Sequence, residues 1–419
     1  FGQDDPEDPK TDNIIFTTTD ENKIKSIHFD SNWQPHKDDG CSICVPADNL
    51  INIYNGVDNF NPRGFNTVFG ICVRCGSVYV RFNCNDDNTA TMVDCTNNDR
   101  RTKMVIPATV SFNDVTYNVT RIAAMTPRDK INGIDFTQAT NLTKIDGHAF
   151  EHWSLIGGQC NWDFSNTKLE YIGEKAFDNA MSAEYLDNEI TGITFPCTIK
   201  EIGWEAFGQH GAADPNVKYI IFTTTDATAI NGIQFGDNWQ PHDDNDCTVY
   251  VPSEDLISVY NGVKNFNPRG YDIDAGIYAK CGDIVARFTC NDDDNTATLV
   301  ECVDDDGTLV VPPTIHINCV TYNVTKIAKL DVREKVEGLD FSQATNLTTI
   351  DGHAFEHWSL VGASCNWDFS NTRLESIGEK AFDNAMAEGK EKNSISLIKF
   401  PKTIKSIGLE AFGQDGNAD

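Results

Sequence analysis

The chain has 419 residues, a hydrophobic content of 40% and a formal net charge of −30 at pH 7. This length allows two or more domains. The charge argues against a nucleic acid or an anionic membrane as partner, because both bind basic surfaces, and no apolar run approaches the length of a membrane span. We interpret the charge as keeping a secreted protein soluble. The chain opens with Phe1 and shows no signal peptide, so we expect a mature or excerpted segment.

A large internal repeat dominates the chain. Phe1, Phe207 and Phe412 each begin a Phe-Gly-Gln segment, and Trp33 corresponds to Trp239. The period is about 205 residues, so the chain holds about two periods. Repeats of this kind predict an architecture of stacked units rather than one globular core.

Residues 1–70 contain a short strand pattern, IIFTTTD, and the piece CSICVPADNLINIYNGVDNF. In this piece a strand ends at Val-Pro, and Leu50, Ile53 and Tyr54 then follow at helical spacing. We therefore expect a strand followed by a short amphipathic helix. Its counterpart, CTVYVPSEDLISVYNGV, begins at Cys247.

Residues 71–107 predict a β-hairpin. CGSVYVRFNC and TATMVDC alternate in hydrophobicity, and an Asn- and Asp-rich turn at 85–88 separates them. CGDIVARFTC and TATLVEC repeat the pattern from Cys281.

The coils between these pieces share the frame of ITFPCTIKEIGWEAF, at 193–207. Its first half alternates as a half-buried strand closed by Pro196. In its second half Ile199, Ile202 and the pair Ala206-Phe207 fall on one side of a turn. A unit this small buries too little apolar surface alone, so we expect the copies to stack. The anchoring aromatics are spaced by 27 to 31 residues, within the range of leucine-rich solenoids.

The repeated IGxxAF turns and xxIxFP strands resemble the BspA-like (Treponema-type) leucine-rich repeats of bacterial and protist surface proteins, over most of the chain. In that family the strand–helix piece resembles the closing cap of an array, and the hairpin resembles its opening. The resemblance implies a β-rich solenoid of tandem arrays, each with a hairpin start and a strand–helix cap. It also implies a secreted or cell-surface location, and family members that resemble this chain act as adhesins.

The domain boundaries follow from this frame. Residues 1–70 are the end and cap of a preceding array. Residues 71–275 form a complete array, with its hairpin at 71–107, coils at 108–246 and cap at 247–275. Residues 276–419 form a second array, with its hairpin at 276–313 and coils at 314–419, and this array lacks its last coil and cap.

The two ends motivate the functional hypothesis. A solenoid end without a cap exposes apolar side chains and unpaired backbone groups. We expect further copies in the same polypeptide or the first 70 residues of the next molecule to cover it, and both outcomes give a head-to-tail rod. The leading hypothesis is a non-enzymatic extracellular structural protein, a repeat segment of a surface filament or stalk. The alternative is an adhesin that binds a host or neighbouring-cell protein or glycan through the solenoid surface.

The 14 cysteines indicate an oxidising compartment. Cys44 and Cys72 are replaced together in the second half of the chain, by Tyr250 and Tyr278. A zinc site that lost two ligands would fail, whereas a disulfide can be lost whole. We therefore expect Cys44 to bond to Cys72.

Other cysteine pairs are less determined. Cys84 and Cys95 flank the hairpin turn and could close it, and Cys41 could bond to Cys75 between cap and hairpin. The counterparts of these two pairs are Cys290 with Cys302 and Cys247 with Cys281. Four cysteines are left unpaired, because stacked coils place the coil cysteines beyond disulfide reach: Cys160, Cys197, Cys319 and Cys365.

Two sets of polar residues suggest modification or metal binding. N-x-T sequons at Asn118, Asn141, Asn323 and Asn346 are N-glycan acceptors if the source is eukaryotic. The acidic turns at Asp86 and Asp87 and at Asp292 and Asp293 could hold calcium. They lack the DxDxDG loop, so an ordinary hairpin turn is the alternative. No other cofactor is expected.

No catalytic grouping is evident. HAFEHW, at 148–153 and again at 353–358, spaces two histidines four apart, but Ala149 and Phe150 read as core residues, so the histidines flank a buried pair and face solvent. A dyad of Cys160 and His148 is conceivable, and a disulfide or buried thiol is the simpler reading. Trp33 and Trp239 could stack on a glycan, and we favour packing at the array end.

Overall fold

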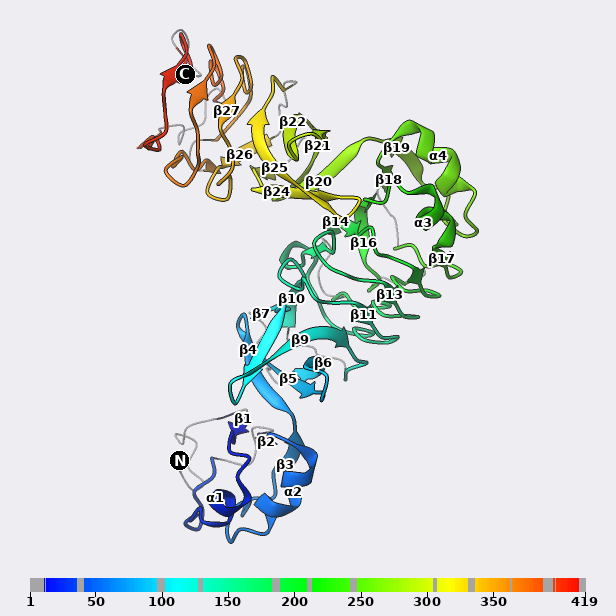
Figure 1. Cartoon of the computed structure of the whole chain (residues 1–419), viewed down its shortest axis with the longest axis vertical. Helices are drawn as coiled ribbons and strands as arrows, with labels where there is room; N and C mark the ends of the chain where they lie inside the picture. Colours follow the sequence, from blue (N-terminus) through cyan, green and yellow to red (C-terminus); the bar gives the residue numbers. More distant parts are fainter. Residues whose placement is uncertain are drawn as a thin grey trace.

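The computed structural model describes residues 11, 13–35, 41–95, 102–126, 131–182, 189–208, 213–241, 247–303, 307–330, 336–361, 364–386, 395 and 397–413. The protein is a β-solenoid, which confirms the predicted fold class. It is elongated, with β1 near one end and the last coil of the second array at the other (Figure 1). None of the helices in these ranges has both the length and the apolar character of a membrane span.

The first segment is a short parallel sheet with two helices. Its strands pair in the order β1 (Asn13–Ile15), β2 (Ser42–Val45) and β3 (Asn66–Phe69). Helix α1 (Glu21–Lys25) starts after Asp20, whose side chain accepts hydrogen bonds from two backbone N–H groups of the first turn. Helix α2 (Asp48–Asn55) buries Leu50 and Tyr54, two of the residues expected at helical spacing, which confirms the strand–helix cap.

The first array begins with the expected hairpin and continues as a ladder of short parallel strands. Strands β4 (Ile71–Cys75), β5 (Val78–Cys84) and β6 (Thr89–Cys95) are antiparallel. The sheet then continues in parallel through β9 (Val115–Ile122), β11 (Lys144–Ile145), β13 (Tyr171–Ile172), β15 (Glu201–Ile202) and β17 (Gln234–Phe235), and β8 (Thr109–Phe112) pairs with β9.

The opposite side of the coils carries two smaller sheets. One pairs β7 (Thr102–Val105) with β10 (Ile131–Asp135). The other runs through β12 (Trp162–Asp163), β14 (Glu189–Phe195), β16 (Asn216–Phe222), β18 (Thr248–Val251) and β19 (Asp272–Ala275). The 3-10 turn η2 (Gly157–Gln159), helix α3 (Ala227–Gly232) and helix α4 (Glu254–Asn261) complete the array.

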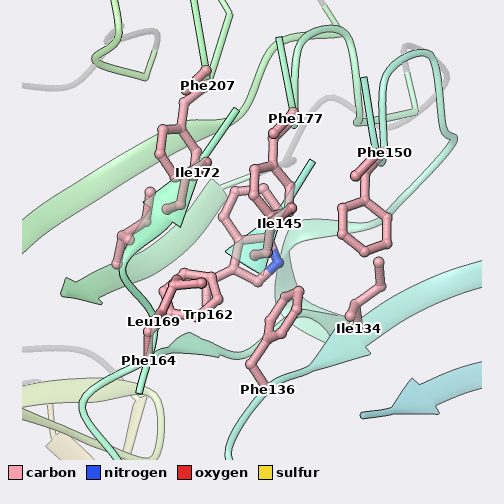
Figure 2. Packing of buried hydrophobic residues seen from close by; sticks show 14 of the residues in the cluster. Ile134, Phe136, Ile145, Phe150, Trp162, Phe164, Leu169, Ile172, Phe177 and Phe207 are labelled. Carbon is pink, nitrogen blue, oxygen red and sulfur yellow. The ribbon is translucent and has the colours of Figure 1, made fainter. Parts of the chain in front are cut away.

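The core between these sheets is a ladder of aromatic and aliphatic side chains, one set from each coil. Phe150, Phe177 and Phe207 stack along the solenoid with ring centroids 5.1 Å apart at each step (Figure 2). Ile172 and Ile202 pair in register on neighbouring strands and are fully buried. Each coil therefore buries its apolar face against the next coil, as the repeat pattern predicts.

The glycine of each IGxxAF turn permits the close stacking of the coils. A Cβ on Gly173 would overlap the backbone of Gly147, and one on Gly203 would overlap the backbone at 173–174. The residue before Ala-Phe has a left-handed conformation, with φ of 51° at Lys175. Backbone hydrogen bonds then join the turns, such as the 2.7 Å bond from the Phe177 N–H to the Ala206 oxygen.

The second array repeats this plan. Its main sheet runs through β20 (Ile277–Cys281), β21 (Ile284–Asn291), β22 (Thr296–Cys302), β25 (Val320–Ile327), β27 (Thr349–Ile350), β28 (Ser376–Ile377) and β29 (Ser406–Ile407), and β24 (Thr314–Ile317) pairs with β25. Strand β23 (Gly307–Val310) pairs with β26 (Val336–Asp340).

Candidate functional site

The most elaborate polar and covalent arrangement lies where the first array meets the second. Strand β20 follows β19 directly, and its hairpin with β21 packs near β14 and β18 of the first array. Tyr278 of β20 lies on Tyr250 of β18 with ring centroids 3.9 Å apart, and both rings are buried together with Ile221 and Val285. This apolar cluster is separate from the cores of the two arrays.

A disulfide between Cys197 and Cys319 crosses the same junction. Cys197 lies in a coil of the first array, and Cys319 lies in the turn between β24 and β25 of the second array, 122 residues later. The neighbouring Asn318 donates its N–H to the Thr223 oxygen at 2.8 Å and accepts the Thr225 N–H with its side-chain oxygen at 3.3 Å. The disulfide and the two hydrogen bonds of Asn318 therefore help to hold the second array to the coils of the first.

The earlier junction, between the first segment and the first array, uses the same positions. The disulfide between Cys44 of β2 and Cys72 of β4 takes the place of the tyrosine pair. It is the pair expected from the joint replacement of these cysteines. Asn113, the counterpart of Asn318, donates its side-chain N–H to the Thr19 hydroxyl at 3.4 Å. Both junctions thus dock the same hairpin turn on the same part of the preceding coil.

The junction also contains a recess of about 190 Å³, with Asp163, Lys280 and His316 among its lining residues. Burial lowers the pKa of Lys280 and that of His316, and the Asp163 carboxylate opposes both shifts. The recess is smaller than the roughly 300–1,000 Å³ of ordinary ligand pockets. We therefore assign it to packing between the arrays.

The hairpin disulfides expected from the sequence are absent. Cys84 and Cys290 are free thiols, so neither is bonded to Cys95 or Cys302. The strand register gives the reason: Cys84 lies opposite Ala90, whereas Cys95 lies opposite Val80, at the far end of the strand pair. At about 3.4 Å per residue, this separation exceeds disulfide reach.

The expected bonds between cap and hairpin are also absent. Cys75 and Cys281 are free buried thiols, so the proposed bonds to Cys41 and Cys247 do not form. Burial raises the pKa of Cys75 to about 12. Cys75 is the last residue of β4, and Cys281 is the last residue of β20. Each side chain packs in the core of its own array rather than toward the cap of the preceding array.

Cys160 is a buried thiol in the first array, and burial raises its pKa to about 12. Its counterpart Cys365 is a free thiol whose pKa burial raises to about 11. At neutral pH both are protonated, and the thiolate is the nucleophilic form. Cys160 is thus a buried thiol and Cys365 a partly buried one, in line with the simpler of the two interpretations of the sequence.

The histidines of HAFEHW lie on turns rather than on a helix. His148 and His152 have φ of 60° and 59°, and they flank Ala149 and Phe150, which are fully buried. The His148 ring contacts Glu151 at 2.9 Å. His353 and His357 repeat the conformation. Among the residues that the structure describes, no group of three or more His, Cys, Asp or Glu side chains has the arrangement of a metal site.

Some carboxylates of the acidic turns accept hydrogen bonds from neighbouring residues. Asp87 accepts hydrogen bonds from the N–H and the hydroxyl of Thr89, at 3.0 and 2.6 Å, and these bonds lower its pKa. Asp292 accepts the Tyr322 hydroxyl at 2.6 Å. Asp86 and Asp293 lie in the same exposed turns. Asp87 thus forms an Asx-type turn, and calcium binding by these acidic turns stays a prediction.

The four sequon asparagines form two side-chain pairs. Asn141 donates to the Asn118 side-chain oxygen at 3.0 Å and to the Ala108 oxygen at 3.2 Å. Asn346 repeats this with Asn323 and Pro313 in the second array. Asn118 and Asn323 are exposed, whereas Asn141 and Asn346 are partly buried. The amide nitrogen that a glycan would modify is thus engaged at one member of each pair.

Trp33 and Trp239 pack at the array ends. Trp239 is fully buried, and its indole N–H donates to the Asn265 oxygen at 2.9 Å. Trp33 stacks on Phe29 at 5.0 Å and donates to the Asn59 oxygen at 2.8 Å. Both tryptophans therefore pack against neighbouring residues, as expected for the ends of the arrays.

Sequence reasoning missed the Cys197–Cys319 bond. It left both cysteines without an assigned partner, because it expected stacked coils to place the coil cysteines beyond disulfide reach. The second array places Lys402 at the position of Cys197, and the first array places Asp114 at the position of Cys319. Both cysteines are therefore replaced together, which is the signal that predicted Cys44–Cys72. The expectation failed because it considered stacking within one array and not the return of the next hairpin.

Comparisons with known proteins agree with this architecture. The profile of the BspA type leucine rich repeat region matches residues 112–213 and 335–417, with 6 copies. Among curated proteins, none matches the chain.

Three solved structures resemble the chain. A leucine-rich repeat protein from Bacteroides ovatus is 13% identical, with a TM-score of 0.30 over 82% of this chain and 91% of that one. The pneumococcal vaccine antigen PcpA is 14% identical, with a TM-score of 0.26 over 83% and 89%. A leucine rich cell surface protein from Faecalibacterium prausnitzii is 12% identical, with a TM-score of 0.19 over 83% and 98%. Because these TM-scores are low, no function of these three proteins is assigned to this chain.

Proposed function

Because this chain belongs to the BspA-type leucine-rich repeat proteins, we propose that it is a non-enzymatic extracellular structural protein, a repeat segment of a head-to-tail surface filament or stalk. The observation that carries the proposal is the repeated junction. Two successive junctions dock the same hairpin turn on the preceding coil, and each contains a disulfide that joins the two sides. A binding module needs only a rigid array, whereas fixed array-to-array geometry is what a rod requires.

A secreted or cell-surface location fits the chemistry of the chain. Disulfides persist in oxidising compartments, and the net charge of −30 keeps neighbouring molecules apart. The ring nitrogens of the turn histidines His148 and His353 contact the carboxylates of Glu151 and Glu356. If the source glycosylates the chain, we expect glycans on the exposed Asn118 and Asn323 before Asn141 and Asn346.

Electron microscopy of the native material tests the proposal. We expect rods longer than one chain, with an axial repeat of one or two arrays. Reduction of the disulfides should increase the bending of the rods at the junctions. Short single particles from a complete, natively purified chain of this length would contradict the filament role.

The second candidate is an adhesin that binds a protein or glycan through the solenoid surface. One observation favours it: Tyr171 is 38% exposed and lines a groove of about 430 Å³ with Glu170, Lys200 and Gln234. An exposed aromatic ring beside polar side chains is the usual chemistry of sugar stacking. The second array has Ser376 at the place of Tyr171, so the aromatic side chain of this groove has no counterpart there.

A glycan array probed with the wild-type chain and with Tyr171→Ala tests this candidate. Binding that is lost in the variant supports adhesion. Equal signals from both proteins, or no signal, would contradict the adhesin candidate and leave the structural role as the proposal.

A further inference from the structure

We propose that the Cys197–Cys319 disulfide is a thiol-exchange site. An external low-molecular-weight thiol opens the bond at Cys319 and so loosens the attachment of the β24–β25 turn to the first array. The site goes beyond the proposed function, because it concerns the chemistry of one bond and applies to a filament segment and to an adhesin alike. The Cys44–Cys72 bond of the earlier junction provides the comparison within the same chain.

The Cys197–Cys319 bond joins two residues that solvent reaches. Cys319 is exposed and lies in the turn between β24 and β25, with a left-handed φ of 61°. Cys197 is partly buried and lines the groove of about 430 Å³ that Tyr171 also lines. The rate of thiol–disulfide exchange depends on access to the attacked sulfur and on the stability of the leaving thiolate. The exposed turn gives access to the Cys319 sulfur, and the groove allows water to stabilise the Cys197 thiolate.

The Cys44–Cys72 bond differs in both respects. Cys44 is 1% exposed in β2, and Cys72 is partly buried in β4. Burial closes the approach to the Cys44 sulfur, and attack on Cys72 would expel a Cys44 thiolate into a buried position. Burial raises the pKa of a thiol, and a thiolate of higher pKa leaves more slowly. An external thiol should therefore open the Cys197–Cys319 bond first.

The exchange consumes two equivalents of the external thiol. The first thiolate forms a bond to the Cys319 sulfur, the bond between Cys319 and Cys197 breaks, and Cys197 leaves as a thiolate. A second thiolate attacks the external sulfur of this mixed disulfide, and Cys319 leaves in turn. The protons lost by the two external thiols pass through water to the two cysteines. The protein disulfide thus gains two electrons and two protons, and the two external thiols become one external disulfide.

Opening the bond changes how the second array is attached. The chain passes between the arrays from β19 to β20, and the Tyr250–Tyr278 pair packs near this connection. The disulfide pins a different point, where Asn318 also hydrogen-bonds to the segment of Thr223 and Thr225. Hydrogen bonds that exchange with water contribute little net stability. Without the covalent bond, the turn therefore detaches from this segment more often, and the second array turns about the tyrosine pair.

Isotope-coded alkylation of the full chain tests which bond opens and at which sulfur. Free thiols are blocked with light N-ethylmaleimide, reduced glutathione is added for increasing times, and new thiols are labelled with heavy N-ethylmaleimide before peptide mapping. We expect glutathione on Cys319 and heavy label on Cys197, at least about tenfold faster than heavy label on Cys44. A comparable or faster opening of the Cys44–Cys72 bond, glutathione on Cys197 in place of Cys319, or a Cys197–Cys319 bond that resists every glutathione concentration would overturn the site.

Hydrogen exchange of the Asn318 amide, in the same full chain, tests the loosening. Glutathione should lower the protection of this amide at least about fivefold, and Cys197→Ser with Cys319→Ser should show the low protection with and without glutathione. The matched control is Cys44→Tyr with Cys72→Tyr, which gives the earlier junction the tyrosine pair of the later one, and it should keep the response to glutathione. Complete opening of the Cys197–Cys319 bond with unchanged protection of Asn318 would overturn the loosening.

Discussion

Ile202 and Ile407 occupy the same position of the two arrays and differ only in what lies beyond them. Ile202 is fully buried between two coils, whereas Ile407 is 46% exposed at the edge of β29. Replacing a buried isoleucine by alanine costs about 2–5 kcal/mol, because a cavity remains between packed neighbours. A residue that is half exposed loses roughly half of a 1.5–3 kcal/mol burial term and leaves no closed cavity. We therefore expect Ile202→Ala to cost about 3 kcal/mol and Ile407→Ala about 1 kcal/mol or less.

Hydrogen exchange measured by mass spectrometry resolves this difference coil by coil in dilute protein. The amides to follow are those of Gly236, which donates to the Ile202 oxygen, and of Gly408, which donates to the Ile377 oxygen. Local protection should fall strongly in Ile202→Ala and little in Ile407→Ala. Ile377→Ala is the control within the second array, because Ile377 is 2% exposed and should behave as Ile202 does. Equal losses at 202 and 407 would refute the argument that a coil is stabilised from both of its faces.

Three further predictions concern the turns, the junction and one carboxylate. Gly173→Ala should destabilise the first array by at least about 1–3 kcal/mol, because its Cβ would overlap the next turn, whereas Gly158→Ala, which faces open space, should leave the melting temperature unchanged. Replacing Cys197 and Cys319 together by serine should lower the free energy of unfolding by about 2–4 kcal/mol, since the bond closes a long loop. In urea unfolding of this variant, reductant should have no effect at this junction. Burial, and then a neighbouring carboxylate, raises the folded pKa of Asp178 above 3.8. The stabilisation from protonated Asp178 is therefore fully present below pH 3.8 and is lost as the pH rises through the raised pKa. The melting temperature should fall less over this pH range in Asp178→Asn than in the wild type.

The first of these predictions fails if Gly173→Ala and Gly158→Ala melt alike. The second fails if reductant still loosens the junction of the serine variant. A melting profile of Asp178→Asn that parallels the wild type across the acidic range would contradict the third.

The coil itself could be predicted from the sequence because its physical requirements are local. Each coil must place apolar residues toward both neighbours and a glycine where the turns touch, so the IGxxAF turn recurs in both arrays, as at Gly173 and Gly203 in the first. The amphipathic helix after the Val-Pro strand follows from the spacing of Leu50 and Tyr54 for the same reason. The joint replacement of Cys44 and Cys72 likewise carried enough information to pair them.

Only the tertiary structure decided which distant segments meet. The register of β5 and β6 sets Cys84 and Cys95 at opposite ends of their hairpin, although both flank its turn in the sequence. The return of the β24–β25 turn onto the first array brings Cys319 to Cys197 across 122 residues. Local patterns fix how each coil folds, because they act over a few residues. The contacts between arrays depend on the accumulated stacking and rotation of all the coils between them, which no short pattern records.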